Sequence, residues 1–350
     1  MSDRFEIQSR YGNARTGIFT TKHGSIQTPA FMPVATQGSV KSLSSEDLIE
    51  IGVSIILSNA YHLMLRPSIN TISELGGLHK FMNWNLPILT DSGGFQTLSL
   101  SRFAKVSEEG VTFKSHIDGK QILMTPELVL ENQAKLGVDV AMLLDHCISP
   151  QSDYLHTKTA MERTHNWAVR SKAVKTTTDQ SVFAIVQGGI DHELRLESAK
   201  TLTEMDFDGY AIGGLSVGES KDDMYKTVSV TSIVLPEEKP RYLMGVGSPE
   251  DIVNCVDYGI DLFDCVLPTR VARNGSLFTK YGRINVNRSI YRYASDPIEE
   301  SCDCYTCSRY SMAYLNHLFK AKELLGYRLA TIHNLRYIMC LMEQIRNHID

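Results

Sequence analysis

The chain has no uninterrupted apolar stretch approaching the roughly 20 residues that a membrane-spanning helix requires. Its first residues, MSDRFEIQSRYGNAR, are polar and lack the apolar core of a secretory signal. We therefore expect a cytoplasmic protein with no membrane partner. Positive charge is also not in excess, because 35 Lys and Arg residues stand against 40 Asp and Glu residues, a net charge of −5. This balance excludes nucleic-acid binding through the overall field and leaves only a local cluster of cations.

Nucleotide-binding motifs and interdomain linkers are also missing. The chain contains no P-loop and no dinucleotide-binding glycine fingerprint. No linker rich in Pro, Gly or Ser divides its 350 residues, and with 43% hydrophobic residues it can bury a large core. Barrels of this length commonly fold as one unit. We therefore expect a single domain that spans residues 1–350.

What the sequence does contain is a series of eight short apolar runs, each followed by a turn signal. The runs are almost continuously apolar, as expected for parallel strands buried on both faces. Helix-like stretches separate most of them, with start and stop signals such as Ser248-Pro249 and Gly259 in SPEDIVNCVDYG. Eight strand–helix units predict an α/β fold, a (β/α)8 TIM barrel. The predicted strands are 31–36, 54–59, 87–91, 139–145, 182–187, 209–214, 241–246 and 260–264.

Two segments do not fit a plain barrel. Residues 110–124 read as a hairpin around Asp118-Gly119, inserted after the third strand. Residues 270–333 follow the eighth strand and carry short elements and three of the seven cysteines, in the string CDCYTC. We interpret this second segment as a zinc-bearing insertion within the barrel domain.

The bunched cysteines favour a metal site, because cysteines of a cytoplasmic chain argue for metal or catalysis before disulfides. Cys302, Cys304 and Cys307 together with His333 supply three thiolates and one imidazole, the ligands of a closed tetrahedral zinc site. Four protein ligands leave no position for substrate, so we expect one structural Zn²⁺ per chain. The alternative is three reduced surface cysteines and a core histidine.

Polar residues follow most of the predicted strands. In a TIM barrel the carboxyl ends of all strands meet at one mouth, where barrel enzymes place their chemistry. For any one strand-end Asp the alternative is a cap on the next helix or a bond to loop amides, but three carboxylates on one rim favour chemistry. Catalytic-metal barrels usually show histidines such as H-x-H at strand ends, and these runs have none. The residues expected at the mouth are Asn59, Asp91, Asp145, Gln187, Gly213, Gly214, Gly245 and Asp264.

The ordered motifs of the chain resemble the tRNA-guanine transglycosylases, in their bacterial form. The strings that carry the resemblance are NAYHLMLRP, LTDSGGFQ, EEGVTFKSHIDG, LDHC, VQGG, DGYAIGGLSVGE, YLMGVG, FDCVLPTR with RNG, and the cysteine–histidine set. The resemblance implies exchange of the wobble guanine of tRNA for a free 7-deazaguanine base, on the route to queuosine. It also implies a homodimer. Tyr310, Tyr314 and His317 lie at 3–4-residue spacings on one face of a helix-like stretch, which either forms the dimer contact or packs on the barrel.

The resemblance also implies the site residues. Asp264 matches the nucleophile and Asp91 the general acid/base, the logic of a retaining glycosidase. Arg270 and Arg273 match positions beside the anticodon loop, and the zinc ligands match Cys302, Cys304, Cys307 and His333. The positions expected to bind the base are Ser92, Phe95, Asp145, Cys147, Gln187, Gly214, Leu215, Val217 and Met244.

The resemblance leaves open which base enters. Val217 and Cys147 fill the space near the base substituent, and a β-branched side chain is stiff, so 7-aminomethyl-7-deazaguanine is expected to be preferred over queuine. The alternatives are a queuine-salvaging transglycosylase, a hydrolase of free nucleosides or small amides, and a non-catalytic zinc-bearing tRNA-binding subunit. The presence of both Asp91 and Asp264 argues against the last.

Overall fold

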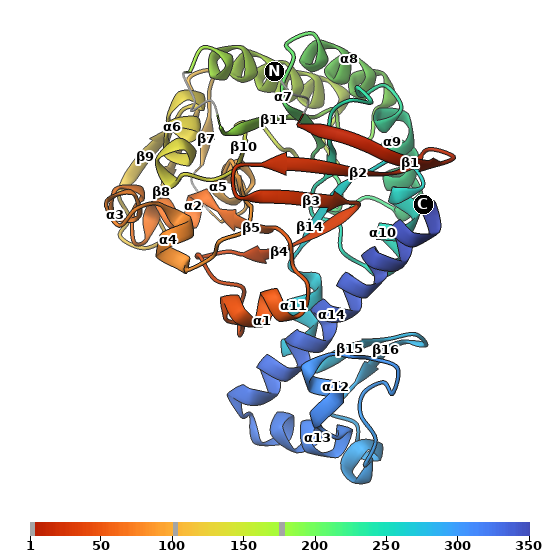
Figure 1. Ribbon diagram of the computed structural model, residues 1–350. Coiled ribbons are helices and arrows are strands. Elements are labelled where there is room, and N and C mark those ends of the chain that lie inside the picture. The colour runs from red at the N-terminus through yellow and green to blue at the C-terminus, as the bar shows by residue number, and fades with distance from the viewer. Residues whose placement is uncertain (1–3, 101–103, 175–178) are drawn as a thin grey trace.

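Eight parallel strands close into a barrel, as predicted (Figure 1). The computed structural model describes residues 4–100, 104–174 and 179–350, with the backbone alone for residues 98–100. Around the barrel the strand order is β10-β11-β12-β13-β14-β4-β5-β6. Each strand falls on one of the eight predicted apolar runs. The strands are β4 (Ala30–Ala35), β5 (Ile56–Asn59), β6 (Ile88–Asp91), β10 (Val140–Met142), β11 (Ser181–Val186), β12 (Gly209–Ile212), β13 (Arg241–Leu243) and β14 (Leu262–Cys265).

Helices follow the strands around the outside, and their ends carry the capping chemistry that the sequence predicts. Ser248 accepts the Asp251 N–H at 3.2 Å at the start of α10, and Gly259, with a φ of +83°, follows the end of that helix. The helices are α1 (Ser45–Glu50), α2 (Ala60–Leu65), α3 (Ile69–Glu74), α4 (Leu78–Met82), α5 (Gly94–Leu100), α6 (Pro126–Leu136), α7 (Tyr154–Lys172), α8 (His192–Thr203), α9 (Lys221–Ser232), α10 (Pro249–Val256) and α11 (Leu267–Arg273).

A three-stranded antiparallel sheet that the sequence analysis did not predict closes the amino end of the barrel. Its strands are β1 (Phe5–Tyr11), β2 (Ala14–Thr21) and β3 (Gly24–Thr28). Phe5, Phe19 and Ile26 are buried and pack with the side chains that fill the barrel. The rings of Phe19 and Phe183 lie 5.7 Å apart. Burial of these apolar side chains seals the barrel at the end opposite its mouth.

The predicted hairpin is present and forms part of a second antiparallel sheet. It contains β7 (Lys105–Val106), β8 (Val111–Lys114) and β9 (Gln121–Met124), with Phe113 opposite Ile122. Val111, Phe113 and Met124 form a small buried cluster with Tyr61 and Trp167. The hairpin is therefore packed against α2, directly beside the end of β5.

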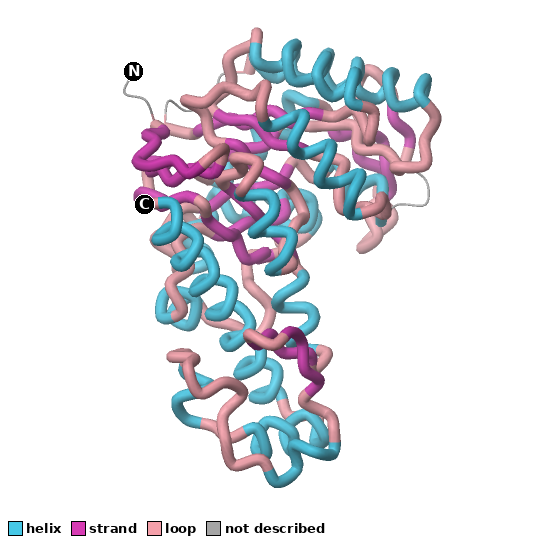
Figure 2. Tube along the Cα trace, turned by 90° about the vertical axis from the view of Figure 1, so that its right-hand side faces the viewer, coloured by secondary structure: helices cyan, strands magenta, loops and turns pink. Residues whose placement is uncertain are grey.

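The residues after the eighth strand form a lobe below the barrel (Figures 1 and 2). It contains β15 (Ser276–Thr279), β16 (Gly282–Asn285), the 3₁₀ helix η1 (Ser289–Tyr293), α12 (Tyr305–Arg309) and α13 (Met312–Ala321). The last helix, α14 (Leu324–Ile349), begins in the lobe and runs back along the barrel to β2 and β4. The predicted insertion ended at residue 333, which lies within this helix.

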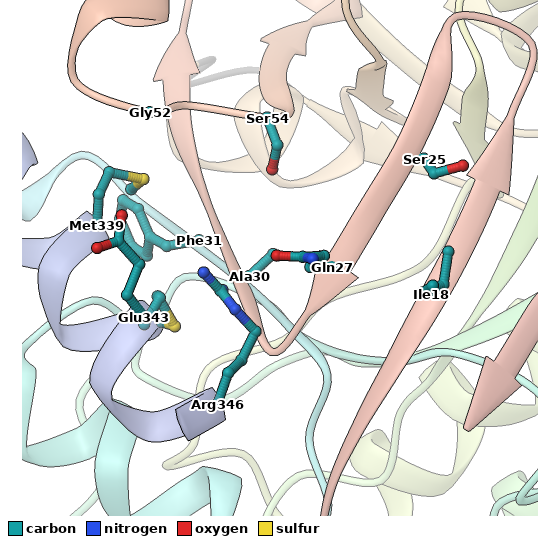
Figure 3. A pocket seen from close by; sticks show the side chains of 11 residues that line it. Ile18, Ser25, Gln27, Ala30, Phe31, Gly52, Ser54, Met339, Glu343 and Arg346 are labelled. Atoms are coloured by element: carbon teal, nitrogen blue, oxygen red, sulfur yellow. The ribbon is translucent and has the colours of Figure 1, made fainter. Parts of the chain in front are cut away.

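Where α14 crosses the amino ends of β4 and β5, a hollow of about 600 Å³ opens to solvent (Figure 3). Phe31, Met339, Glu343 and Arg346 are among its lining residues, and Arg346 donates to the carbonyl of Pro29 at 2.8 Å. The hollow lies at the amino end of the strands and is not part of the mouth. Across the described ranges 4–100, 104–174 and 179–350, no helix combines the length and apolar character needed to cross a bilayer.

Candidate active site at the barrel mouth

Asp91 ends β6 and is almost fully buried, at 7% exposure. Its carboxylate accepts hydrogen bonds from the Asn59 amide, from the Ala60 N–H at 3.0 Å and from the Gln96 amide at 2.8 Å. Burial raises the pKa of Asp91 to about 7, with the Asp264 carboxylate adding to the rise and the hydrogen bonds from Asn59 and Ala60 opposing it. A carboxyl group that titrates near neutral pH can both donate and accept a proton.

Asp264 lies in β14 and is held by two donors on one oxygen. The Tyr242 hydroxyl donates to Oδ1 at 2.5 Å and the Gly245 N–H donates to the same atom at 2.8 Å. Burial raises the pKa of Asp264. Burial also raises the pKa of Tyr242 well above its usual value, so that the tyrosine stays a donor. Within the described part of the chain no hydrogen-bond donor faces Oδ2, which leaves that oxygen available to a substrate.

The two glycines that follow Asp91 allow three chain segments to meet. Gly93 has a φ of +80°, and a Cβ on it would lie 3.0 Å from the Cβ of Tyr61. A Cβ on Gly94 would lie 2.9 Å from the carbonyl oxygen of Asp145. The backbone after β6 therefore fits between α2 and the segment after β10. This close approach brings Ser92 beside Asp145.

Asp145, Ser92 and Gln187 form a second polar group at the mouth. Asp145 accepts from the Ser92 hydroxyl at 3.3 Å and from the Gln187 amide at 2.7 Å. Burial raises the pKa of Asp145 to about 6, against the opposing effect of these hydrogen bonds. Gly214 has a φ of +67°, and a Cβ on it would lie 2.5 Å from Gln187 Oε1. A larger residue at position 214 would displace Gln187, so this glycine keeps the amide in place.

The other positions expected to bind the base lie on the segments that follow β6, β10, β12 and β13, and they differ in exposure. Phe95, on α5, is 49% exposed and offers a flat ring at the rim, whereas Leu215 is buried. Cys147 is partly buried, and burial raises its pKa to about 12, so that it remains a neutral thiol. Val217 is partly exposed and donates its N–H to Glu219 at 3.1 Å. Met244 packs on the cluster that fills the barrel.

Two residues that the sequence analysis missed hold the loops around this group. Arg195, on α8, is completely buried and donates to the carbonyls of Val186, Gly189 and Gly213, each at 2.8 Å. It thereby joins the loops after β11 and β12. Glu219 accepts the backbone N–H groups of Ser216 and Val217. Neither residue had a distinguishing signal, because a charged residue within a helix or loop usually faces solvent.

Arg270 and Arg273 lie on α11, which directly follows the Asp264 strand. Arg270 is exposed. Arg273 is partly buried and donates to the Thr269 carbonyl at 2.7 Å. The two guanidinium groups therefore stand on the element between the mouth and the lobe.

The cysteine–histidine set is brought together in the lobe. His333 Nδ1 lies 3.7 Å from the Sγ atoms of Cys302 and Cys304, and 3.3 Å from that of Cys307. His333 Nε2 donates to the Phe278 carbonyl at 2.7 Å, which fixes the ring with Nδ1 facing the thiols. The four ligand atoms lie within 4.8 Å of one another and fit a tetrahedral Cys₃His zinc site.

Comparison with known proteins gives one consistent result. A family model described as Queuine tRNA-ribosyltransferase matches residues 10–350. A protein of that name from Thermoanaerobacter sp. is 57% identical over 338 residues, which cover 96% of this chain and 90% of the relative. The Herpetosiphon aurantiacus protein is 54% identical over 345 residues, covering 99% and 88%. The Rickettsia typhi protein is 51% identical over 346 residues, covering 99% and 96%.

Proposed function

Because the chain belongs to the queuine tRNA-ribosyltransferase family, we propose that it exchanges the wobble guanine of tRNAs for a 7-deazaguanine base through a covalent tRNA–enzyme intermediate. The observation that supports this most is the pair of carboxylates at the mouth. Asp264 keeps one oxygen open toward the substrate, and Asp91 has a pKa of about 7 that its neighbour helps to raise. These are the separate requirements of a nucleophile and of an acid/base group.

In the proposed reaction Asp264 attacks C1′ of the nucleotide, so that a C–O bond forms and the glycosidic C–N bond breaks. Asp91 assists the departure of guanine as a proton donor. The incoming base then attacks C1′ and displaces Asp264, while Asp91 accepts its ring proton. One glycosidic bond replaces another, so the exchange needs no redox cofactor or nucleoside triphosphate.

The polar group around Asp145 supplies the contacts for the base. Asp145 accepts hydrogen bonds, the Gln187 amide and the Ser92 hydroxyl offer both a donor and an acceptor, and Phe95 provides a ring for stacking. Base recognition at this mouth requires the wobble nucleotide to leave its stack. We assign Gly214, Leu215, Val217, Cys147 and Met244 to the wall of the same pocket.

The base that we propose is 7-aminomethyl-7-deazaguanine. The backbone N–H of Val217 donates a hydrogen bond to Glu219, which restrains the residue, and Cys147 lies close to Asp145. Both side chains occupy space that a larger substituent would need. The alternative is an enzyme that salvages queuine. The hydrogen-bond donors that orient Asp91 and Asp264 argue against a non-catalytic tRNA-binding subunit.

For the remaining partners we propose tRNA contact at Arg270 and Arg273, one structural Zn²⁺ in the Cys₃His set, and a homodimer. The zinc would hold α12 against α14, because three ligands precede or lie in α12 and His333 lies in α14. Zinc bound by four protein ligands supplies folding energy and no chemistry at the mouth.

The test is incorporation of radiolabelled guanine into unmodified tRNA, followed by chase with each unlabelled base. We expect label to enter tRNA and the 7-aminomethyl base to displace it. A protein that binds tRNA but incorporates no label would be the non-catalytic subunit. Release of free base without incorporation would identify a hydrolase.

A further inference from the structure

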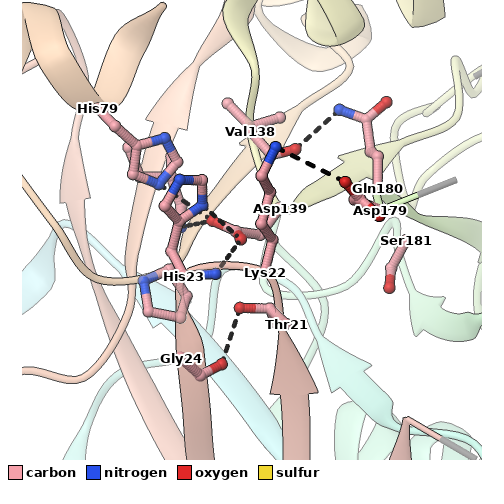
Figure 4. A network of polar contacts seen from close by, with 12 residues as sticks. Thr21, Lys22, His23, Gly24, His79, Val138, Asp139, Asp179, Gln180 and Ser181 are labelled. Atoms are coloured by element: carbon pink, nitrogen blue, oxygen red, sulfur yellow. Dashed lines mark hydrogen bonds and ion pairs between the residues drawn. The ribbon is translucent and has the colours of Figure 1, made fainter. Parts of the chain in front are cut away.

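A second cluster of metal-type ligands lies at the end of the barrel opposite the carboxylates (Figure 4). His23 lies in the turn between β2 and β3, His79 lies in α4, and Asp139 immediately precedes β10. Asp145 follows the same strand at the mouth, so β10 separates the two sites. The three residues are far apart in the sequence, and no sequence motif connects them.

The two imidazoles face one carboxylate. His23 Nδ1 lies 2.8 Å from Asp139 Oδ1, and His79 Nε2 lies 3.1 Å from Asp139 Oδ2. The two rings are stacked, with centroids 3.6 Å apart and an angle of 21° between their planes. The ligand atoms of the three residues lie within 4.8 Å of one another. Two nitrogens and a carboxylate oxygen therefore converge on one small volume.

The carboxylate is fixed independently of the imidazoles. Oδ1 accepts the backbone N–H of His23 at 3.1 Å, and Oδ2 accepts the backbone N–H of Ile88 at 2.9 Å. Both carboxylate oxygens are therefore oriented by backbone donors, as expected for a preformed metal ligand.

Solvent reaches the cluster from the imidazole side, because the side chains of His23 and His79 are 28% and 12% exposed while that of Asp139 is fully buried. An ion can therefore enter and keep water in its remaining positions. Two imidazoles and one carboxylate suit divalent first-row transition ions, whereas Mg²⁺ and Ca²⁺ prefer oxygen ligands alone.

We propose that His23, His79 and Asp139 form a second metal site, for Zn²⁺ or a similar divalent transition ion. The ion joins the β2–β3 turn and α4 to the start of β10, and so fastens the closing sheet to the barrel. The bound ion replaces the two imidazole protons through which His23 and His79 otherwise hydrogen-bond to Asp139. The site stands apart from the exchange chemistry, and the stability of the closed barrel end is what it affects.

The experiment measures metal content by equilibrium dialysis of the full chain, purified without a histidine tag, against low micromolar Zn²⁺. We expect the wild-type protein to bind one more equivalent than either His79→Gln or His23→Gln. His192→Gln removes an exposed histidine at the start of α8 and serves as the matched control, which should retain the wild-type count. Circular dichroism verifies that each variant is folded.

Co²⁺ provides a second readout that separates this site from the cysteine set. The equivalent lost in His79→Gln should carry ligand-field bands without thiolate-to-cobalt charge transfer, because its ligands are nitrogen and oxygen. Equal metal content in the wild type and both variants, or loss of the extra equivalent in His192→Gln as well, would overturn the proposal.

Discussion

At the scale of single residues, Asp91 and Asp264 share a mouth but have different partners, so their loss should have different effects. Asp264→Asn removes the attacking oxygen, and no tRNA should remain bound on a denaturing gel. Asp91→Asn removes the proton carrier and should slow exchange by about 10²–10⁴-fold. Filter binding should show that both variants retain tRNA. An Asp264→Asn protein that still traps tRNA covalently would refute the assignment of the nucleophile.

The raised pKa of Asp91 also has a consequence for stability. Below pH 4 the group is protonated in both the folded and unfolded states. As the pH rises toward 7, the unfolded state releases its proton while the folded state holds it, so stability falls across this window. The loss is at most about 4 kcal/mol, since each pKa unit corresponds to roughly 1.4 kcal/mol.

Urea denaturation of the wild type and Asp91→Asn from pH 4 to 8 measures this. The variant should gain stability relative to the wild type as the pH rises, and the difference should level off above pH 7. Asp257→Asn alters an exposed carboxylate at the end of α10 and should show no such trend. A constant difference between Asp91→Asn and the wild type would mean that burial does not raise this pKa.

Val217 is the residue at which base preference can be tested. Overfilling a packed pocket costs roughly 1–3 kcal/mol, which is one to two decades in affinity. Val217→Gly should therefore narrow the gap between queuine and the 7-aminomethyl base, as measured by competition against labelled guanine. Equal use of both bases by the wild-type protein would instead indicate a salvage enzyme.

At the scale of elements, the proposed zinc would link α12 to α14, because Cys307 lies in α12 and His333 lies in α14. Cys304→Ser should lose zinc, loosen α12 from α14, and lower both tRNA binding and the midpoint of thermal unfolding. Metal analysis measures the loss of zinc, and circular dichroism measures the midpoint of thermal unfolding. Cys255→Ser, at a buried cysteine in α10 away from the lobe, is the control that should keep its metal. A zinc-free Cys304→Ser protein with unchanged folding and activity would rule out a structural zinc.

The sequence correctly predicts the strands and helix ends, because apolar runs and capping side chains mark them locally. The eight strands are apolar on both faces, and Thr125 and Ser248 cap helices through their own side chains. The closing sheet was missed because β1 alternates polar and apolar residues within a polar segment, and its burial depends on docking. Asp91, Asp145 and Asp264 were found by their position at strand ends. Arg195 and Glu219 were not, because only tertiary contacts identify them.

At the scale of the whole molecule, the lobe presents a stacked aromatic surface that a second copy can cover. The rings of Tyr310 and Tyr314 lie 5.5 Å apart with a 19° angle between them, and His317 stacks on Tyr314 at 6.4 Å. Tyr314 is 39% exposed. Light scattering should give twice the 39.2 kDa chain mass for the wild type. Tyr314→Ala should shift the protein toward the monomer, and Tyr281→Ala, at an 88% exposed residue of the same lobe, should not. A monomeric wild type would contradict the dimer.

The uninterrupted helix α14 fixes the distance between the lobe and the barrel. The helix has 26 residues and is about 39 Å long, and it contains no proline. His333 in its middle belongs to the cysteine set, while its last turns contact β2 and β4 of the barrel. A continuous helix resists bending, so the lobe cannot swing on a hinge in this segment. The distance between the lobe and the amino ends of the barrel strands is therefore set by the length of this helix.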